Sequence, residues 1–112
     1  MSPGTSHNIR ERILAEARLF GFDVAWRMSA VLANGPRAGG KEESLRHYGS
    51  LDRLQEVLQY VTPLVEELDR RVPGFGRWLE HTGFGNDVGM IGALAFWMNR
   101  LHAASSNMMR KQ

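Results

Sequence analysis

The sequence predicts an all-α protein, a small bundle of five to six helices, and three observations lead to this prediction. Apolar residues recur at intervals of three and four along most of the chain, which is the spacing of helices with one buried face. No run of residues alternates apolar and polar side chains, so no strand is expected. Glycine and proline interrupt the periodic stretches, and helices are expected to end there.

The first two helices are expected to form a pair over residues 9–33, preceded by a flexible N-terminus at residues 1–8. Gly21 ends the first helix, because glycine favours helix termination. Asp23 is expected to cap the second, since its carboxylate can accept a backbone hydrogen bond. The side chains expected to face the core are Ile9, Ile13, Ala17, Phe20, Val31, Leu32 and either Trp26 or Met28.

A loop rich in glycine and proline at residues 35–41 separates this pair from a helical segment at residues 42–102. The strongest periodicity of the chain lies within that segment, where apolar residues continue without a break from Leu51 to Leu68. Pro63 interrupts the hydrogen bonding of this stretch, so the helix either kinks there or restarts there. The unbroken stripe favours two nearly collinear pieces.

The C-terminal part of the segment predicts a pair of helices that resembles a helix-turn-helix, over residues 75–81 and 87–102. Gly83 suits a left-handed helix end, and Asn86 or Asp87 suits the cap of the following helix. Residues 103–112 are mostly polar and are expected to fray. All of residues 9–102 therefore form one helical domain, which agrees with a chain of 112 residues.

Composition excludes several functional classes. The chain has no cysteine, which excludes disulfides and thiolate metal sites and fits a reducing compartment. The four histidines are isolated in the sequence, so neither a metal site nor a cofactor is expected. No set of polar residues indicates a shared chemistry, so no enzyme is expected. The formal net charge is +2 and no apolar run could span a bilayer, so neither nucleic acid nor membrane is the favoured partner.

The last helix has apolar groups on more than half of its circumference. A helix of this kind is either buried or in contact with a partner, and one small core is expected to leave part of it uncovered. Self-association is therefore predicted through this helix. The residues expected to carry it are Met90, Leu94, Trp97 and Leu101.

Two pieces of the sequence match a known sequence pattern. Residues 45–49, Leu-Arg-His-Tyr-Gly, are similar to the start of a segment in which Leu-Arg precedes Trp-Gly or Tyr-Gly. Residues 78–87 followed by 90–94 are similar to the Thr-Gly-x-Gly-Asn ending of that segment. Together the two pieces resemble bacteriophage capsid scaffolding and related virion-assembly proteins. Val88 and Gly89 depart from the pattern, which has proline there, and the family's chains are longer and acidic.

The resemblance implies a helical protein of phage origin that self-associates and holds coat protein through a C-terminal helical segment. Its location would be the cytoplasm of the host bacterium, and transiently the inside of the assembling capsid. Arginines beside aromatic anchor residues could bind an acidic patch on the partner. The expected partner-binding residues are Arg77, Trp78, Trp97 and Arg100, with Arg70 and Arg71 as steering charges.

Two other hypotheses remain open. A small phage protein of this kind could instead bind and inhibit or redirect a host protein, which the short, compact chain favours. The third hypothesis is a helical DNA-binding regulator that uses the N-terminal helix pair. That hypothesis fits less well, because the second helix would begin with Asp23 and apolar residues where a recognition helix has polar or basic ones.

Overall fold

The structure is a computed structural model that describes the backbone of residues 5–110 and the side chains of residues 8–105. The prediction of an all-α fold is confirmed: the described backbone holds six α-helices, one short 3₁₀ helix and no strand. In chain order these are α1 (Thr5–Phe20), α2 (Phe22–Asn34), α3 (Gly40–Tyr48), α4 (Leu51–Arg71), α5 (Phe75–Thr82), η1 (Phe84–Asn86) and α6 (Val88–Arg110).

Several helix boundaries differ from the expected ones, and α3 begins at Gly40, inside the loop expected at residues 35–41. Helix α1 begins at Thr5, inside the segment expected to be a flexible N-terminus. Helix α6 continues to Arg110, through most of the tail expected to fray. The expected flexible N-terminus also includes residues 1–4, and the expected fraying tail includes residues 111–112. Both stretches lie outside the described residues.

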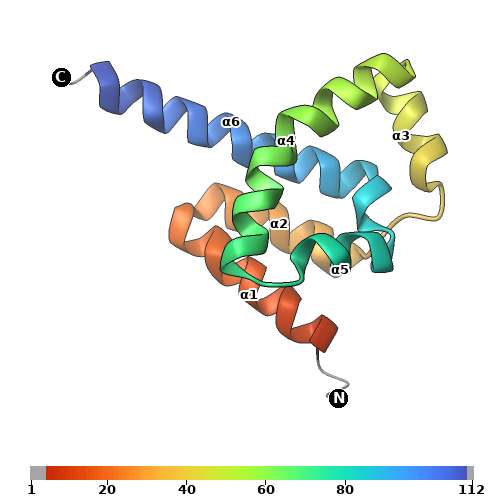
Figure 1. Cartoon of the computed structure of the whole chain (residues 1–112), viewed down its shortest axis with the longest axis horizontal. Coiled ribbons are helices and arrows are strands. Elements are labelled where there is room, and N and C mark those ends of the chain that lie inside the picture. The colour runs from red at the N-terminus through yellow and green to blue at the C-terminus, as the bar shows by residue number, and fades with distance from the viewer. Residues whose placement is uncertain (1–4, 111–112) are drawn as a thin grey trace.

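Helix α6 is the central element of the bundle. It contacts α2, α3, α4 and η1, while α1 packs on α2 and α5. Figure 1 shows α6 crossing the molecule behind the bent α4, with the α1–α2 pair below it. The last turns of α6 extend beyond the other helices (Figure 1).

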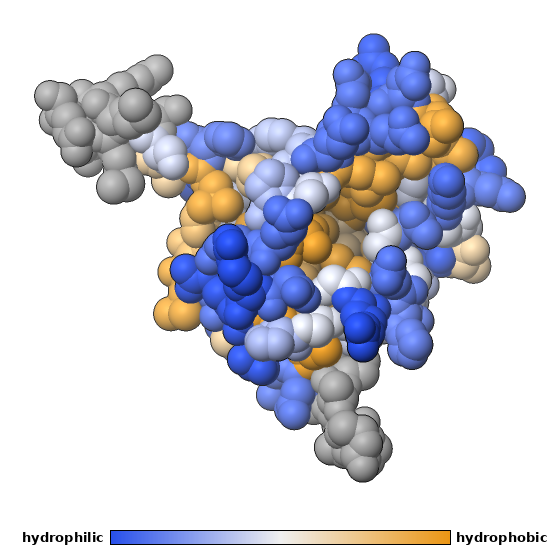
Figure 2. Space-filling model, in the orientation of Figure 1, coloured by the Kyte–Doolittle hydropathy of each residue, from blue (hydrophilic) through white to orange (hydrophobic). Residues whose placement is uncertain are grey.

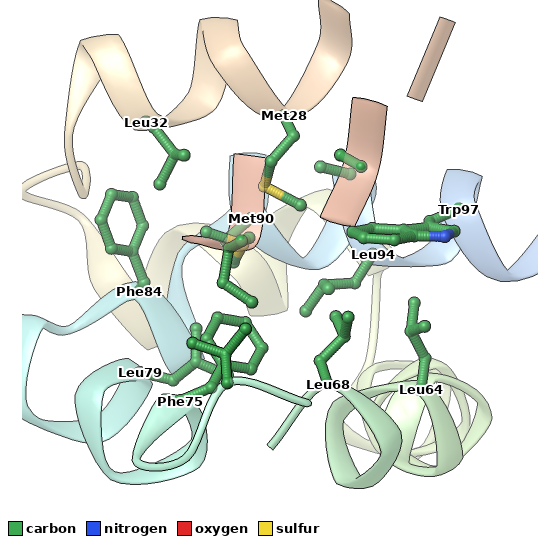
Figure 3. Close-up of a cluster of buried hydrophobic side chains, with 14 of the residues drawn as sticks. Met28, Leu32, Leu64, Leu68, Phe75, Leu79, Phe84, Met90, Leu94 and Trp97 are labelled. Carbon is green, nitrogen blue, oxygen red and sulfur yellow. The ribbon is translucent and has the colours of Figure 1, made fainter. Parts of the chain in front are cut away.

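The hydrophobic core lies where α1, α2, α4, α5 and α6 meet. Figure 3 shows Met90 and Leu94 of α6 in the middle of this cluster, with Met28 of α2 on one side and Phe75 and Leu68 of α5 and α4 on the other. Met28, Phe75 and Met90 are completely buried. Burial of such side chains contributes about 1.5–3 kcal/mol each, so this junction supplies much of the folding free energy.

The α1–α2 pair has a joint of a single residue, Gly21, where the first helix ends as predicted. Gly21 also occupies the N-cap position of α2, so the expected cap, Asp23, is one residue inside the helix. The Asp23 carboxylate accepts a hydrogen bond from the adjacent Val24 N–H at 2.9 Å instead. Of the two alternatives for the buried side chain, Met28 is correct, since Trp26 is exposed.

Pro63 lies inside one helix, α4, and does not divide it into two collinear pieces. Figure 1 shows the axis of α4 turning part-way along, so that its first half passes beside α3 and its second half beside α5. Proline removes a backbone donor and its ring crowds the preceding turn, which bends a helix. The neighbouring Thr62 hydroxyl donates to the Leu58 carbonyl at 2.7 Å, a contact that also accompanies bends.

The buried carboxylate of Asp87 joins the start of α6 to the loop after α2. One oxygen accepts from the Met90 N–H at 2.9 Å and so caps α6, as predicted. The other accepts from the Arg37 N–H at 2.7 Å. Nearby, the buried Ser44 hydroxyl donates to the Asn86 carbonyl at 2.7 Å, which fixes α3 to the same point. The loop and α3 are therefore tied to the start of α6 by hydrogen bonds between side chains and the backbone.

Candidate protein-binding surface

Large apolar side chains are exposed together where α1 meets α2. Leu19, Phe22 and Trp26 have 82%, 81% and 71% of their surface exposed. Figure 2 shows hydrophobic atoms gathered at the left edge of the molecule, over the junction of these two helices in Figure 1. We call these three residues the α1–α2 corner. Monomeric proteins rarely leave such a cluster uncovered unless it binds something.

The helical phase of α2 explains why this corner is exposed. Val24, Met28 and Leu32 recur at intervals of four and face the core. Phe22 and Trp26, also four apart, lie about 150° around the helix from that row, because each residue advances about 100°. They therefore point outward, and their rings stack with centroids 6.3 Å apart.

A groove of about 540 Å³ runs beside the corner, between α2 and α6. Phe96 of α6 forms its far wall, with the Arg27 guanidinium 5.0 Å from the centre of that ring. Arg100 of α6 is ion-paired with Asp23 of α2 at 2.9 Å. The groove therefore combines aromatic walls with charged groups at its edge, which is the usual composition of a protein interface.

A second groove, of about 250 Å³, lies on the other side of the corner between α1, α4 and α6. Leu19, Phe20 and Trp97 line it, and Phe20 and Trp97 have ring centroids 6.2 Å apart. Charged side chains border it: Arg71 pairs with Glu16 at 3.5 Å and with Glu67 at 3.0 Å.

The carboxylate of Glu67 also accepts a hydrogen bond from Arg70. The hydrogen bonds from Arg70 and Arg71 hold the pKa of Glu67 below its usual value, and Glu67 in turn raises the pKa of Arg71. Both arginines predicted to be steering charges are thus engaged with carboxylates of their own chain.

Two of the predicted anchors are part of the core. Trp78 is 5% exposed and stacks on Phe75 and Phe84, with ring centroids 5.9 and 5.2 Å away. Trp97 is 3% exposed and packs on Phe20. These positions correct the expectation that both tryptophans face a partner: a side chain that is already packed cannot also be an exposed anchor. The exposed tryptophan is Trp26.

The residues expected to mediate self-association are covered in the same way. Met90, Leu94 and Trp97 are buried in their own core, and Leu101 is half-buried against it. These four side chains are therefore largely covered within one chain, because α2, α3, α4 and η1 contact α6. Self-association through this stripe would require the fold to open.

The predicted arginines are spread over three places. Arg77 lies on α5 beside a hollow of about 310 Å³ that it shares with Trp78. Arg70 and Arg71 end α4 in the ion pairs with Glu67. Arg100 lies next to the α1–α2 corner through its pair with Asp23, and Arg71 also borders the groove that Leu19 lines. The structure does not bring Arg77 and Arg100 into one surface feature.

The described part of the chain contains neither a candidate metal site nor a candidate membrane-spanning helix. Within it, no group of three histidine, aspartate or glutamate side chains is placed to hold a metal ion. None of the described helices is long and apolar enough to cross a bilayer. Comparisons with protein-family models, with curated proteins and with solved structures found no match to this chain.

Proposed function

We propose that this chain is a non-enzymatic phage protein that binds other protein chains during capsid assembly, and that the α1–α2 corner is its docking surface. The observation that carries the proposal is the exposure of Leu19, Phe22 and Trp26 at one place. Aromatic residues in the middle of an apolar patch, surrounded by charged groups, provide most of the binding energy in protein complexes.

The state of the nearby arginines supports a protein partner over a nucleic acid. Arg71 and Arg100 are paired with carboxylates, and Arg27 lies over an aromatic ring. A guanidinium that is already paired gains less from a phosphate than a free one, and the corner itself is apolar. Nucleic-acid binding would instead need a cluster of available cations.

The phage assignment depends on the resemblance of residues 45–49 and 78–94 to virion-assembly proteins. On that basis the partner is a coat or portal protein, and the chain acts in the host cytoplasm and inside the forming shell. The alternative partner is a host protein that the chain inhibits or redirects. Both partners would use the same corner, so the identity of the captured protein separates them.

The test is an affinity pull-down from infected or lysogen-bearing cells, read by mass spectrometry, with and without nuclease. Phe22→Glu places a charge in the corner, while Leu51→Glu is the matched control at an exposed leucine on α4. We expect coat or portal protein with the wild type and the control, but not with Phe22→Glu. Circular dichroism checks that all three chains are equally helical.

Each other outcome contradicts part of the proposal. Capture of one host protein, lost in Phe22→Glu, would replace the assembly role with the host-directed one. Capture that disappears with nuclease would favour nucleic acid. Capture unchanged in Phe22→Glu would show that the corner is not the docking surface.

A further inference from the structure

We infer that a groove between α4, α5 and α6 is a second docking surface, which takes a basic peptide segment of another protein and holds it by one large apolar side chain. This surface goes beyond the proposed function. It shares no lining residue with the two grooves beside the α1–α2 corner, and its ligand carries positive charge.

The apolar part of the groove is a hollow of about 170 Å³ that lies across the bend of α4. Leu58, before Pro63, and Val65, after it, line the hollow from α4. Leu79 of α5 and Ile91 of α6 also line it. Figure 2 shows hydrophobic atoms in a hollow in the middle of this face, beneath the first half of α4 in Figure 1.

The hollow has room for one large apolar side chain. An apolar cavity of about 150 Å³ holds one benzene ring. A phenylalanine or leucine side chain of a partner therefore fits it. Burial of such a side chain in a preformed hollow is the usual source of affinity in a protein interface.

Carboxylates beside the hollow determine the charge of the partner. Glu66 borders both the hollow and a wider groove of about 660 Å³ that continues along α4 and α5. Asp69 and Glu80 also line the wider groove, and Arg77 is the one cation among its lining residues. The lining therefore has a formal charge of −2.

Two of these carboxylates are available to a ligand. Glu66 and Glu80 are exposed, and neither has an ion-pair or hydrogen-bond partner for its carboxylate within the described part of the chain. Asp69 uses one oxygen to accept from the Gly76 N–H at 2.9 Å. Glu67 differs from them, since it pairs with the arginines at the end of α4.

A basic peptide fits this surface better than other charged ligands do. No three acidic or histidine side chains among the described residues are placed to hold one metal ion. The carboxylates repel nucleic acid and anionic membranes. The whole chain has a formal charge of +2, so attraction of a cation must come from this face and not from the net charge.

The spacing along α4 indicates the sequence of the peptide. Glu66 and Asp69 follow Val65 by one and four residues, which is about 1.5 and 6 Å along the helix axis. Alternate side chains of an extended peptide are about 7 Å apart. The expected motif is therefore a large apolar residue with arginines two and four residues away.

The probe is a fluorescein-labelled peptide of sequence Ser-Phe-Ser-Arg-Ser-Arg-Ser, and fluorescence anisotropy at low salt measures its binding to the full chain. We expect saturable binding. Glycine in place of the phenylalanine should raise the Kd about tenfold or more, because the hollow is then left empty. Glutamates in place of both arginines should abolish binding.

Variants of the chain test the carboxylates. Glu66→Lys combined with Glu80→Lys should raise the Kd of the probe about tenfold or more. Asp52→Lys combined with Glu56→Lys is the matched control, because it makes the same charge change at exposed positions of α4 outside the groove. The control should bind as the wild type does, and circular dichroism checks that both variants keep their helices.

Absence of saturable binding at protein concentrations up to about 1 mM would overturn the inference. Equal weakening by the two pairs of lysines would also overturn it, as would equal affinity for the peptide without phenylalanine.

The corner variant Phe22→Glu separates this inference from the proposed function. It should bind the probe as the wild type does, and loss of binding would place the peptide at the corner and overturn the inference. A chain that binds the probe but captures no phage or host protein would support the inference and contradict the assembly role. Capture through Phe22 without probe binding would do the reverse.

Discussion

Asp87→Asn tests the buried carboxylate that joins the start of α6 to the loop after α2. Two backbone N–H groups point at the two oxygens of Asp87, which is 2% exposed. An asparagine has one oxygen and one NH₂ group, so one of the two N–H groups would face another donor.

The cost has two parts. A buried donor left without an acceptor costs about 1–3 kcal/mol. The acceptor of the remaining hydrogen bond is also no longer charged, which lowers the contribution of that bond to stability from about 1.5–3 to about 0.5–1.5 kcal/mol. Removing the desolvation cost of the carboxylate offsets some of this. We expect a loss of about 3 kcal/mol in the free energy of unfolding, or roughly 10 °C in Tm for a domain of this size.

Urea denaturation followed by circular dichroism measures this loss. Asp52→Asn is the matched control, because Asp52 is an exposed aspartate in the first turn of α4. It should change the free energy of unfolding by less than about 0.5 kcal/mol. If Asp87→Asn behaved like the control, the two hydrogen bonds would not be holding the loop and α6 together, and the reasoning would be refuted.

Two further predictions concern stability. Trp78→Ala should lower the free energy of unfolding by about 3–5 kcal/mol, because it leaves a cavity in the core. Trp26→Ala should lower it by about 0.5 kcal/mol or less, measured by urea denaturation at low protein concentration. Equal losses in the two variants would contradict the burial of Trp78 and the exposure of Trp26. Burial raises the pKa of Tyr48, while the positive charge of Arg27 partly opposes this shift. The neutral Tyr48 side chain therefore contributes fully to the folding free energy below about pH 10. This contribution is lost as the pH rises through the raised pKa. The stability of the wild type should therefore fall more steeply above that pH than that of Tyr48→Phe, and parallel curves would contradict the shift.

Local signals in the sequence were enough to predict most of the fold. Gly21 and Gly83 mark helix ends, and the turn before α6 predicts Asn86 or Asp87 as its cap, of which the structure shows Asp87. Ser50, before the long stripe, also caps its helix, since it accepts from the Arg53 N–H at 3.2 Å. Such signals are read correctly because caps and turns depend on residues close in sequence.

The candidate surface could not be predicted in the same way, since exposure depends on which helices pack together. Trp78 and Trp97 are expected to be anchors because tryptophan is favoured at interfaces and both lie in the segment that resembles virion-assembly proteins, yet they fill the core. Phe22 and Trp26 are the exposed aromatics. Their phase relative to Val24 and Met28 can be read from the sequence, but the sequence does not decide whether Trp26 or Met28 faces the core, because that depends on how the helices pack.

The single-residue joint at Gly21 has a consequence for the order in which the chain is made. Helices α1 and α2 form a hairpin of sequence neighbours, which can fold as soon as both have left the ribosome. Its inner face, with Ile13 and Met28, packs in the core to which α6 contributes, and α6 is synthesised after all the other described helices. The nascent hairpin therefore exposes apolar groups on both faces, and we expect chaperones to bind it until α6 is complete.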